Sequence, residues 1–166
     1  MIGKERHDVG RPDDQGYPIR GMIRGDYLYL KNFETERWPA GNPETGYMNV
    51  DGSPTKTEVL KAKHNKETAY YWQLSFGKRK AEELYNIRKD PDCMVNLAEM
   101  PEYETLKRKL EKEMTLRLVE QEDPRMFGRG GLFDKYPDMS PAHQFWNRTE
   151  AGEKVRSGWV NPTDFQ

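Results

Sequence analysis

Two clusters of cationic and aromatic side chains are the parts of this sequence best suited to chemistry. One of them is Arg37-Trp38, which has acidic residues on both sides. An arginine guanidinium can hold a sulfate or a carboxylate through two parallel hydrogen bonds, and a tryptophan can stack on the face of a sugar ring. The clusters therefore indicate a site for an anionic ligand, with two plainer alternatives: a solvated polar segment and a loop anchored by its tryptophan. The other cluster lies nearer the N-terminus and consists of Lys4, Glu5, Arg6, His7, Asp8 and Arg11.

Other kinds of site find little support in the residue spacing. The three histidines lie far apart in the sequence, and neither Cys-x-x-Cys nor His-x-x-x-His occurs, so we expect no metal. Cys93 follows Asp90-Pro91-Asp92, where negative charge disfavours the thiolate that a nucleophile needs. A phosphate loop of the Gly-x-x-x-x-Gly-Lys-Ser type is absent. We therefore expect no catalytic residue and no cofactor in this chain.

Short elements must position the two clusters. Residues 17–33 are predicted to form a β-hairpin that reverses at Arg24-Gly25-Asp26, with a bulge near Gly21 because the first arm does not alternate strictly. The stretch from Asn32 to Pro54 is rich in Gly and Pro, which predicts an irregular loop of about twenty residues around Arg37-Trp38.

Two helices and a strand are predicted next. The first helix begins at Pro54 with Ser53 as its N-cap, and the second covers 67–76. A strand over 82–87 then ends at Asp90-Pro91, and Asn96-Leu97 is predicted to step into a helix.

The strongest helical signal covers 101–121. Its apolar residues recur every three or four positions and therefore share one face, while Glu104–Arg108 and Glu113–Arg117 form i,i+4 pairs on the solvated side. The apolar face consists of Tyr103, Leu106, Leu110, Met114 and Leu118.

This order of elements is typical of the α+β class. We predict a small antiparallel β-sheet packed against one long C-terminal helix, with an irregular aromatic-rich tail. The predicted division is an N-terminal leading segment, 1–16, an α+β domain, 17–123, and a wrapping tail, 124–166.

Composition narrows the function classes. The chain has 166 residues, of which 34% are hydrophobic, yet it holds 4 Trp, 9 Tyr and 6 Phe, too many aromatic residues for a typical disordered segment. The 27 basic and 28 acidic residues are nearly balanced, so we expect no nucleic-acid partner. No apolar run is long enough to span a membrane and no signal peptide follows Met1, so we expect neither a membrane partner nor a targeting signal.

Several short motifs carry a resemblance to a known family. The longest is Glu82-Glu83-Leu84-Tyr85-Asn86-Ile87-Arg88-Lys89-Asp90-Pro91, continued by Asn96-Leu97. It resembles the Glu-Leu-Tyr-Asp-Leu-x-x-Asp-Pro-x-Glu-x-x-Asn-Leu signature in the C-terminal domain of sulfatases, except that Cys93 stands where Glu or Gln is usual. Six further motifs follow the order seen in sulfatases of the heparan N-sulfatase (sulfamidase) type: Gly3-Lys4-Glu5-Arg6-His7, Gly16-Tyr17-Pro18-Ile19-Arg20, Tyr27-Leu28-Tyr29-Leu30-Lys31-Asn32-Phe33, Arg37-Trp38-Pro39-Ala40-Gly41, Gly52-Ser53-Pro54-Thr55-Lys56-Thr57 and Asp123-Pro124-Arg125.

The resemblance implies that this chain is one part of an enzyme. Such sulfatases carry their nucleophile in Cys/Ser-x-Pro-Ser-Arg, converted to formylglycine, beside an acidic Ca²⁺ site in an N-terminal catalytic domain, and neither motif occurs here. By the resemblance, Glu5, Arg6 and His7 lie beside the substrate pocket, and Arg37 and Trp38 lie in a loop that reaches it. We therefore expect substrate binding by these residues, with His7 the best candidate, and partners in the catalytic domain and a sulfated glycan.

Alternatives from other classes stay open at this point. The chain could be a free-standing binding module for anionic glycans, or a purely structural interaction domain. As a sulfatase part it is expected to be inactive alone and to self-associate, and the parent enzyme is expected to be periplasmic, secreted or lysosome-like.

Overall fold

The computed structural model describes residues 1–166, which form two compact units that interleave along the chain. Unit 1 comprises residues 1–5, 18–34 and 80–135, and unit 2 comprises residues 6–17, 35–79 and 136–166. Each of the three predicted parts, 1–16, 17–123 and 124–166, contributes residues to both units.

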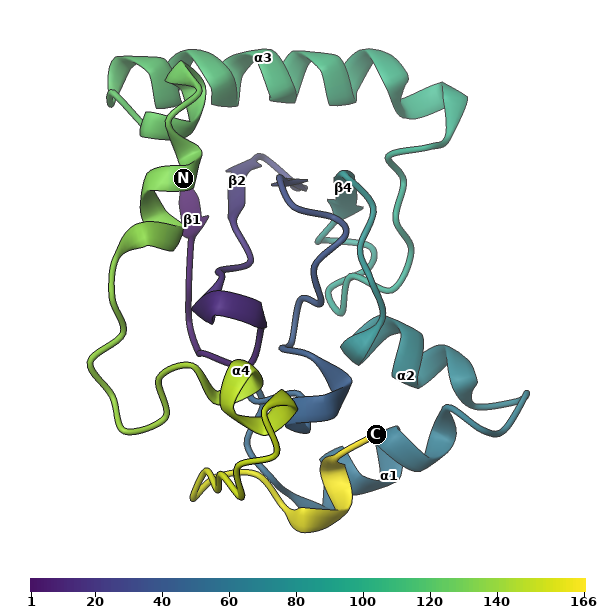
Figure 1. The fold of residues 1–166 in the computed structure, drawn as a ribbon. Helices are drawn as coiled ribbons and strands as arrows, with labels where there is room; N and C mark the ends of the chain where they lie inside the picture. The colour runs from purple at the N-terminus through teal and green to yellow at the C-terminus, as the bar shows by residue number, and fades with distance from the viewer. The chain divides into compact units, whose positions relative to one another are not determined.

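Unit 1 has the predicted α+β architecture. Four antiparallel strands pair in the order β1-β2-β3-β4, and a long helix, α3, runs across them (Figure 1). A single 3-10 turn, Pro101–Tyr103, leads into this helix, and two more, Pro124–Phe127 and Gly130–Lys135, follow it. The bounds are Ile2–Lys4 for β1, Ile19–Arg24 for β2, Tyr27–Asn32 for β3, Glu82–Asn86 for β4 and Glu104–Glu120 for α3.

The central hairpin forms as predicted, but without a bulge. Gly25 adopts a left-handed φ of 58° in the reversal, which a side chain would disfavour. Strands β2 and β3 pair residue for residue from Ile19↔Asn32 to Arg24↔Tyr27, so the expected bulge near Gly21 is wrong. Gly21 breaks the alternation for a steric reason, because a Cβ there would lie 2.5 Å from Leu30 Cδ2.

Strand β1 is an element that the sequence did not predict. Ile2–Lys4 pairs with Gly21–Ile19 at the edge of the sheet, in a stretch that was expected to be loop. Three residues among polar neighbours carry no period-2 signal, so only the pairing with β2 reveals the strand.

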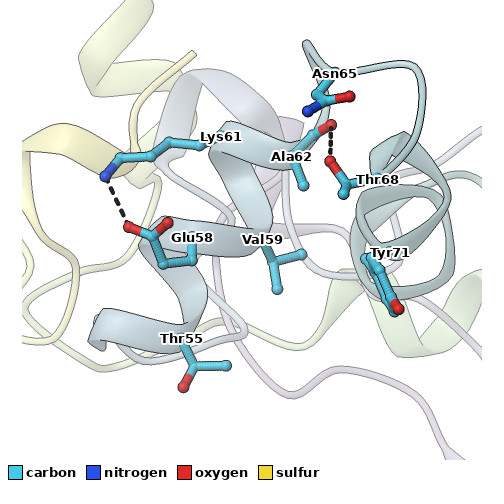
Figure 2. Close-up of a pocket in the computed structure, with 8 residues that line it drawn as sticks. All are labelled: Thr55, Glu58, Val59, Lys61, Ala62, Asn65, Thr68 and Tyr71. Atoms are coloured by element: carbon cyan, nitrogen blue, oxygen red, sulfur yellow. Dashed lines mark hydrogen bonds and ion pairs between the residues drawn. The ribbon is translucent and has the colours of Figure 1, made fainter.

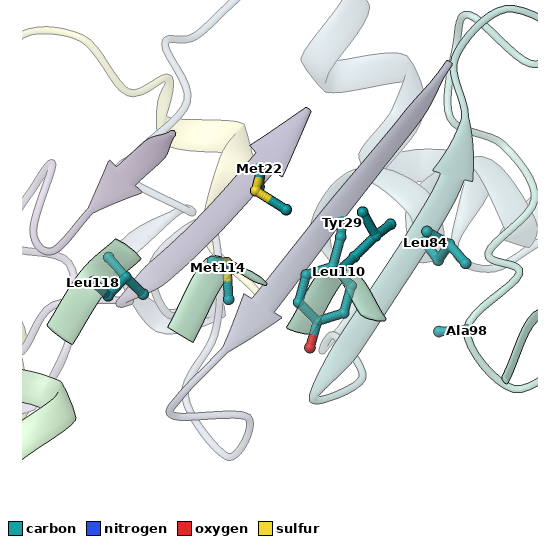
Figure 3. Packing of buried hydrophobic residues seen from close by; sticks show 7 residues of the cluster. All are labelled: Met22, Tyr29, Leu84, Ala98, Leu110, Met114 and Leu118. Atoms are coloured by element: carbon teal, nitrogen blue, oxygen red, sulfur yellow. The ribbon is translucent and has the colours of Figure 1, made fainter. Parts of the chain in front are cut away.

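The core of unit 1 lies between α3 and one face of the sheet (Figure 3). Leu110, Met114 and Leu118 are at most 3% exposed, and Tyr103 and Leu106 pack beside them, which confirms the predicted helix face. The predicted ion pairs on the solvated side of α3 are also present. From the sheet and the following turn, Met22, Tyr29, Leu84 and Ala98 complete the cluster.

The other face of the sheet carries apolar side chains on β1, β2 and β3, whereas buried Asn32, Glu83 and Tyr85 lie on it toward β4. Ile23 and Leu28 are cross-strand partners on it, Leu30 follows two residues later, and Ile2 lies at its β1 edge. Ile2 is 43% exposed and Ile23 is 53% exposed. An antiparallel sheet with one face on its core usually carries polar residues on the other, so these exposed isoleucines need an explanation.

Three side chains build the turn after β4. Asn86 Oδ1 accepts hydrogen bonds from two backbone N–H groups, and the Asp90 carboxylate accepts two more. Asn96 Oδ1 accepts from the N–H groups of Leu84 and Ala98, and its Nδ2 donates to the Glu82 carbonyl. Asn96 thereby covers the open edge of β4, and it does not start a helix as expected: α3 begins only at Glu104.

Unit 2 is built from helices and irregular segments. Helix α1 (Pro54–Ala62) has Pro54 in its first turn and Ser53 as its N-cap, as predicted, and helix α2 (Ala69–Phe76) lies within the predicted range. The tail contributes α4 (Phe145–Glu150), and single 3-10 turns occur at Pro12–Asp14, Pro43–Thr45 and Pro162–Asp164.

The core of unit 2 draws on the long loop and the tail. Tyr47, Met48 and Phe145 are fully buried, although no regular spacing of apolar residues in the sequence marks them as core residues. Trp159 Nε1 donates to the carbonyl of Met48 at 3.0 Å, which attaches the tail to the loop. No helix in the chain has the length and apolar character needed to cross a bilayer.

Candidate functional site

The structure places Glu5 apart from the other predicted site residues, in unit 1, within a largely buried ion-pair network. Arg125 holds both carboxylate oxygens, with Nε 2.8 Å from Oε1 and Nη2 2.7 Å from Oε2. Arg20 Nη2 lies 2.5 Å from Oε1, and Arg20 Nε lies 2.6 Å from Asp123 Oδ2. Both carboxylate oxygens of Glu5 are therefore engaged by arginine.

Cations control the ionisation of this network. Burial alone would raise the pKa of Asp123, but hydrogen bonds from the Arg20 side chain and the Arg125 N–H outweigh it and keep the pKa below its usual value. The rings of Phe33 and Phe133 lie 5.4 and 5.6 Å from the Arg125 guanidinium. The network therefore contains cations that are both paired and stacked, which is a stable structural arrangement.

Arg6 and His7 lie in unit 2. Arg6 is half-buried, and its Nη1 donates to the carbonyls of Asp14 and Tyr136 at 3.2 and 3.0 Å. His7 is exposed. The neighbouring Asp8 has a raised pKa because it is partly buried, although the Val9 N–H and the charge of His7 oppose the rise.

Trp38 anchors the long loop of unit 2. It is half-buried, and its ring meets the rings of Tyr47 and Trp72 edge-on at 6.2 and 6.4 Å. Lys78 Nζ lies 5.7 Å from the centroid of the same ring. These contacts correspond to the plainer alternative for Trp38, and they leave only part of the ring for a ligand.

Two arginines bring the segment of Arg6 and His7 against the loop of Arg37 and Trp38. Arg11, which is fully buried, donates from Nε to the Trp38 carbonyl at 2.6 Å and from Nη2 to the Pro39 carbonyl at 2.9 Å. Arg37 Nη1 donates in return to the Gly16 carbonyl at 2.9 Å. The structural importance of Arg11 was missed from the sequence, where it counted only as a member of a basic cluster.

Two observations bear on the chemistry that these side chains could support. No group of three or more His, Cys, Asp or Glu side chains is placed to hold a metal ion. Burial raises the pKa of the Cys93 thiol, and the charges of Asp90, Glu83 and Asp92 raise it further. Cys93 is therefore not poised as a thiolate nucleophile.

Unit 2 also contains an open groove of about 420 Å³ along α1 and α2, which the sequence did not predict (Figure 2). The ring of Tyr71, 51% exposed, forms part of its wall. The only sequence signal is the Tyr70-Tyr71 pair, which was predicted to lie on a helix but was not linked to a ligand. The lining residues are Thr55, Glu58, Val59, Lys61, Ala62, Asn65, Thr68 and Tyr71.

Comparison of the chain with family models and with curated proteins finds no match.

Proposed function

We propose that this chain is the C-terminal part of a sulfatase that hydrolyses sulfate esters or sulfamates of sulfated glycans, and that it helps to shape the substrate pocket. The activity itself would belong to an N-terminal catalytic domain, which would also hold the formylglycine and the Ca²⁺. By the same resemblance the parent enzyme would be periplasmic, secreted or lysosome-like.

The observation that carries this proposal is the ion-pair network around Glu5. Its members come from three separate family-like motifs: Glu5 from 3–7, Arg20 from 16–20, and Asp123 with Arg125 from 123–125. These motifs resemble the family in their residues and their order, and the outermost two lie more than a hundred residues apart in the sequence. Their convergence on one buried network supports the view that they form a set, which chance similarities would not be expected to do.

The proposed roles of the site residues follow from their contacts. His7 would contact the sulfate or the sugar, because it is the exposed member of its cluster, and the half-buried Arg6 would contact the same ligand from the neighbouring position. Arg37 and Trp38 would support the same pocket from the loop, since Arg11 and Arg37 hold the two segments together. Glu5 would be a positioning residue. Such residues accelerate a reaction by orienting the substrate, and small misplacements can be costly.

The first test uses the chain alone and its genomic reading frame. The isolated chain should hydrolyse neither an aryl sulfate nor N-sulfoglucosamine, with or without Ca²⁺, because positioning cannot replace a nucleophile. Release of sulfate can be measured by ion chromatography. Sequencing the frame upstream of Met1 should then show Cys/Ser-x-Pro-Ser-Arg.

Two outcomes would contradict this proposal. Metal-dependent turnover that survives Cys93→Ala would place an active site within the chain. A stop codon directly upstream would instead favour a free-standing module for anionic glycans or a structural domain.

The apolar part of the second face of the sheet bears on the proposed partner. Contiguous exposed apolar surface marks interaction sites, and a catalytic domain would cover Ile2 and Ile23. Without that cover we expect the isolated chain to self-associate. Sedimentation velocity across a range of concentrations should therefore show a rising mass, and Ile23→Glu should reduce it.

The matched control for this experiment is Val95→Glu. Val95 is 51% exposed, close to the value for Ile23, but it lies in the turn after β4. The Val95→Glu variant should leave the self-association unchanged. A wild-type chain that stays monomeric at all concentrations would count against an uncovered docking face.

A further inference from the structure

The groove along α1 and α2 has the composition of a ligand site. Its floor and walls combine the small apolar groups of Val59 and Ala62 with hydroxyl, amide and charged groups. Sites for small ligands typically pair such apolar surface with a few placed polar groups. All the lining residues lie between positions 55 and 71, within unit 2.

Tyr71 gives the groove an aromatic ring, and Tyr70, which does not line the groove, packs beside it. Tyr70 is 47% exposed, and its ring centroid lies 4.6 Å from that of Tyr71. Tyrosine rings that are half exposed keep apolar surface in contact with water, and a ligand with an apolar face would relieve this. The C–H face of a pyranose ring has that character.

The polar groups match a hydroxylated and acidic ligand. Lys61 Nζ forms an ion pair with Glu58 Oε1 at 2.8 Å, and both side chains are about two-thirds exposed, so the pair can open toward a ligand (Figure 2). Asn65 uses Oδ1 to accept from the Glu67 N–H, which leaves its NH₂ group as a donor. Lys61 is the only basic residue that lines the groove.

These features favour a saccharide over a nucleic acid. A strand of nucleic acid needs a basic track for its phosphates, whereas this chain carries 27 basic and 28 acidic residues and only one lysine, Lys61, lines the groove. A saccharide needs an aromatic face, hydrogen-bonding groups beside it and one or two cations for its acidic substituents, all of which the groove offers.

We propose that the α1–α2 groove is a binding site for an acidic oligosaccharide, separate from the site of Arg6 and His7. The ring of Tyr71 stacks on a sugar, and Lys61 exchanges Glu58 for a sulfate or carboxylate of the ligand. The choice of a sulfated saccharide as the occupant rests on the proposed function. The groove would hold a long glycan chain whose end is processed elsewhere.

Calorimetric titration of the full chain with an N-sulfated glucosamine–uronic acid tetrasaccharide tests this site. Tyr71→Ala should weaken binding by about tenfold or more. Lys61→Gln should also weaken it, whereas Glu58→Gln should tighten it, because Lys61 is then free for the anion. Phe127→Ala is the matched control, since Phe127 is 49% exposed, lies in unit 1 and does not line the groove, and it should have no effect.

Each alternative gives a different result. Weaker binding in Glu58→Gln would mean that the carboxylate contacts a neutral sugar, and equal binding in Tyr71→Ala, with a wild-type thermal transition, would mean that the groove is not the site. Either result overturns the proposal, as does tighter binding of a ten-nucleotide oligouridylate. The titration measures binding without turnover, so its result can be interpreted even if the sulfatase assignment fails. A neutral N-acetylglucosamine tetrasaccharide that binds equally well would refute the acidic ligand alone.

Discussion

Replacing Lys56 by methionine should lower the free energy of unfolding by about 3–5 kcal/mol, the range for breaking a buried ion pair from one side. Lys56 Nζ lies 2.7 Å from the Gly46 carbonyl, 2.6 Å from the Val50 carbonyl and 3.2 Å from Asp164 Oδ2. The side chains of Lys56 and Asp164 are 1% and 0% exposed. Without the ammonium group, a carboxylate and two carbonyls would remain buried with no cation.

The measurement can be confined to unit 2. All four tryptophans lie there, so urea unfolding followed by tryptophan fluorescence reports on this unit. The double variant Lys56→Met, Asp164→Leu should recover much of the loss, because replacing both charges by apolar groups is often close to neutral. A single variant with an unchanged midpoint would mean that water reaches the Lys56 ammonium.

Leu110→Ala should cost about 2–5 kcal/mol, because it opens a cavity between α3 and the sheet of unit 1. Leu110 is 1% exposed and lies in the cluster with Tyr29 and Met114 (Figure 3). Urea unfolding followed by helical circular dichroism, together with hydrogen exchange of the α3 amides, would measure the effect.

A control on the same helix separates packing from helix propensity. Leu116 is 55% exposed, and Leu116→Ala should stay within about 0.5 kcal/mol of wild type. Equal losses in the two variants would show that the face of Leu110 is not the buried one.

The sequence predicted those elements whose signals are local. The apolar period of 101–121 predicts both the helix and its buried face, and Gly25 predicts the reversal of the hairpin. Ser53 and Pro54 define the start of α1 because capping depends on neighbours three residues apart. In each case the stabilising contacts lie within a few residues of one another.

What could not be predicted depends on distant partners. Gly21 suggested a bulge, whereas its cause is the Leu30 side chain on the next strand. Glu5 was placed with Arg6 and His7 as a ligand contact, because nothing in the sequence pairs it with Arg125, 120 residues away. The groove could not be predicted for a related reason. The sequence predicts α1 and α2 separately, but the exposure of Tyr71 depends on how the two helices pack.

The interleaving of the two units also limits how this chain can be divided. The path passes from one unit to the other five times, at 5/6, 17/18, 34/35, 79/80 and 135/136. No truncation from either terminus removes one unit and leaves the other complete, since residues 1–5 and 136–166 belong to different units. A protease nick at 79/80 would likewise give two fragments that each hold pieces of both units, so the nicked halves should stay associated until a denaturant separates them. Duplication or exchange of this region during evolution would therefore have to involve the whole stretch at once.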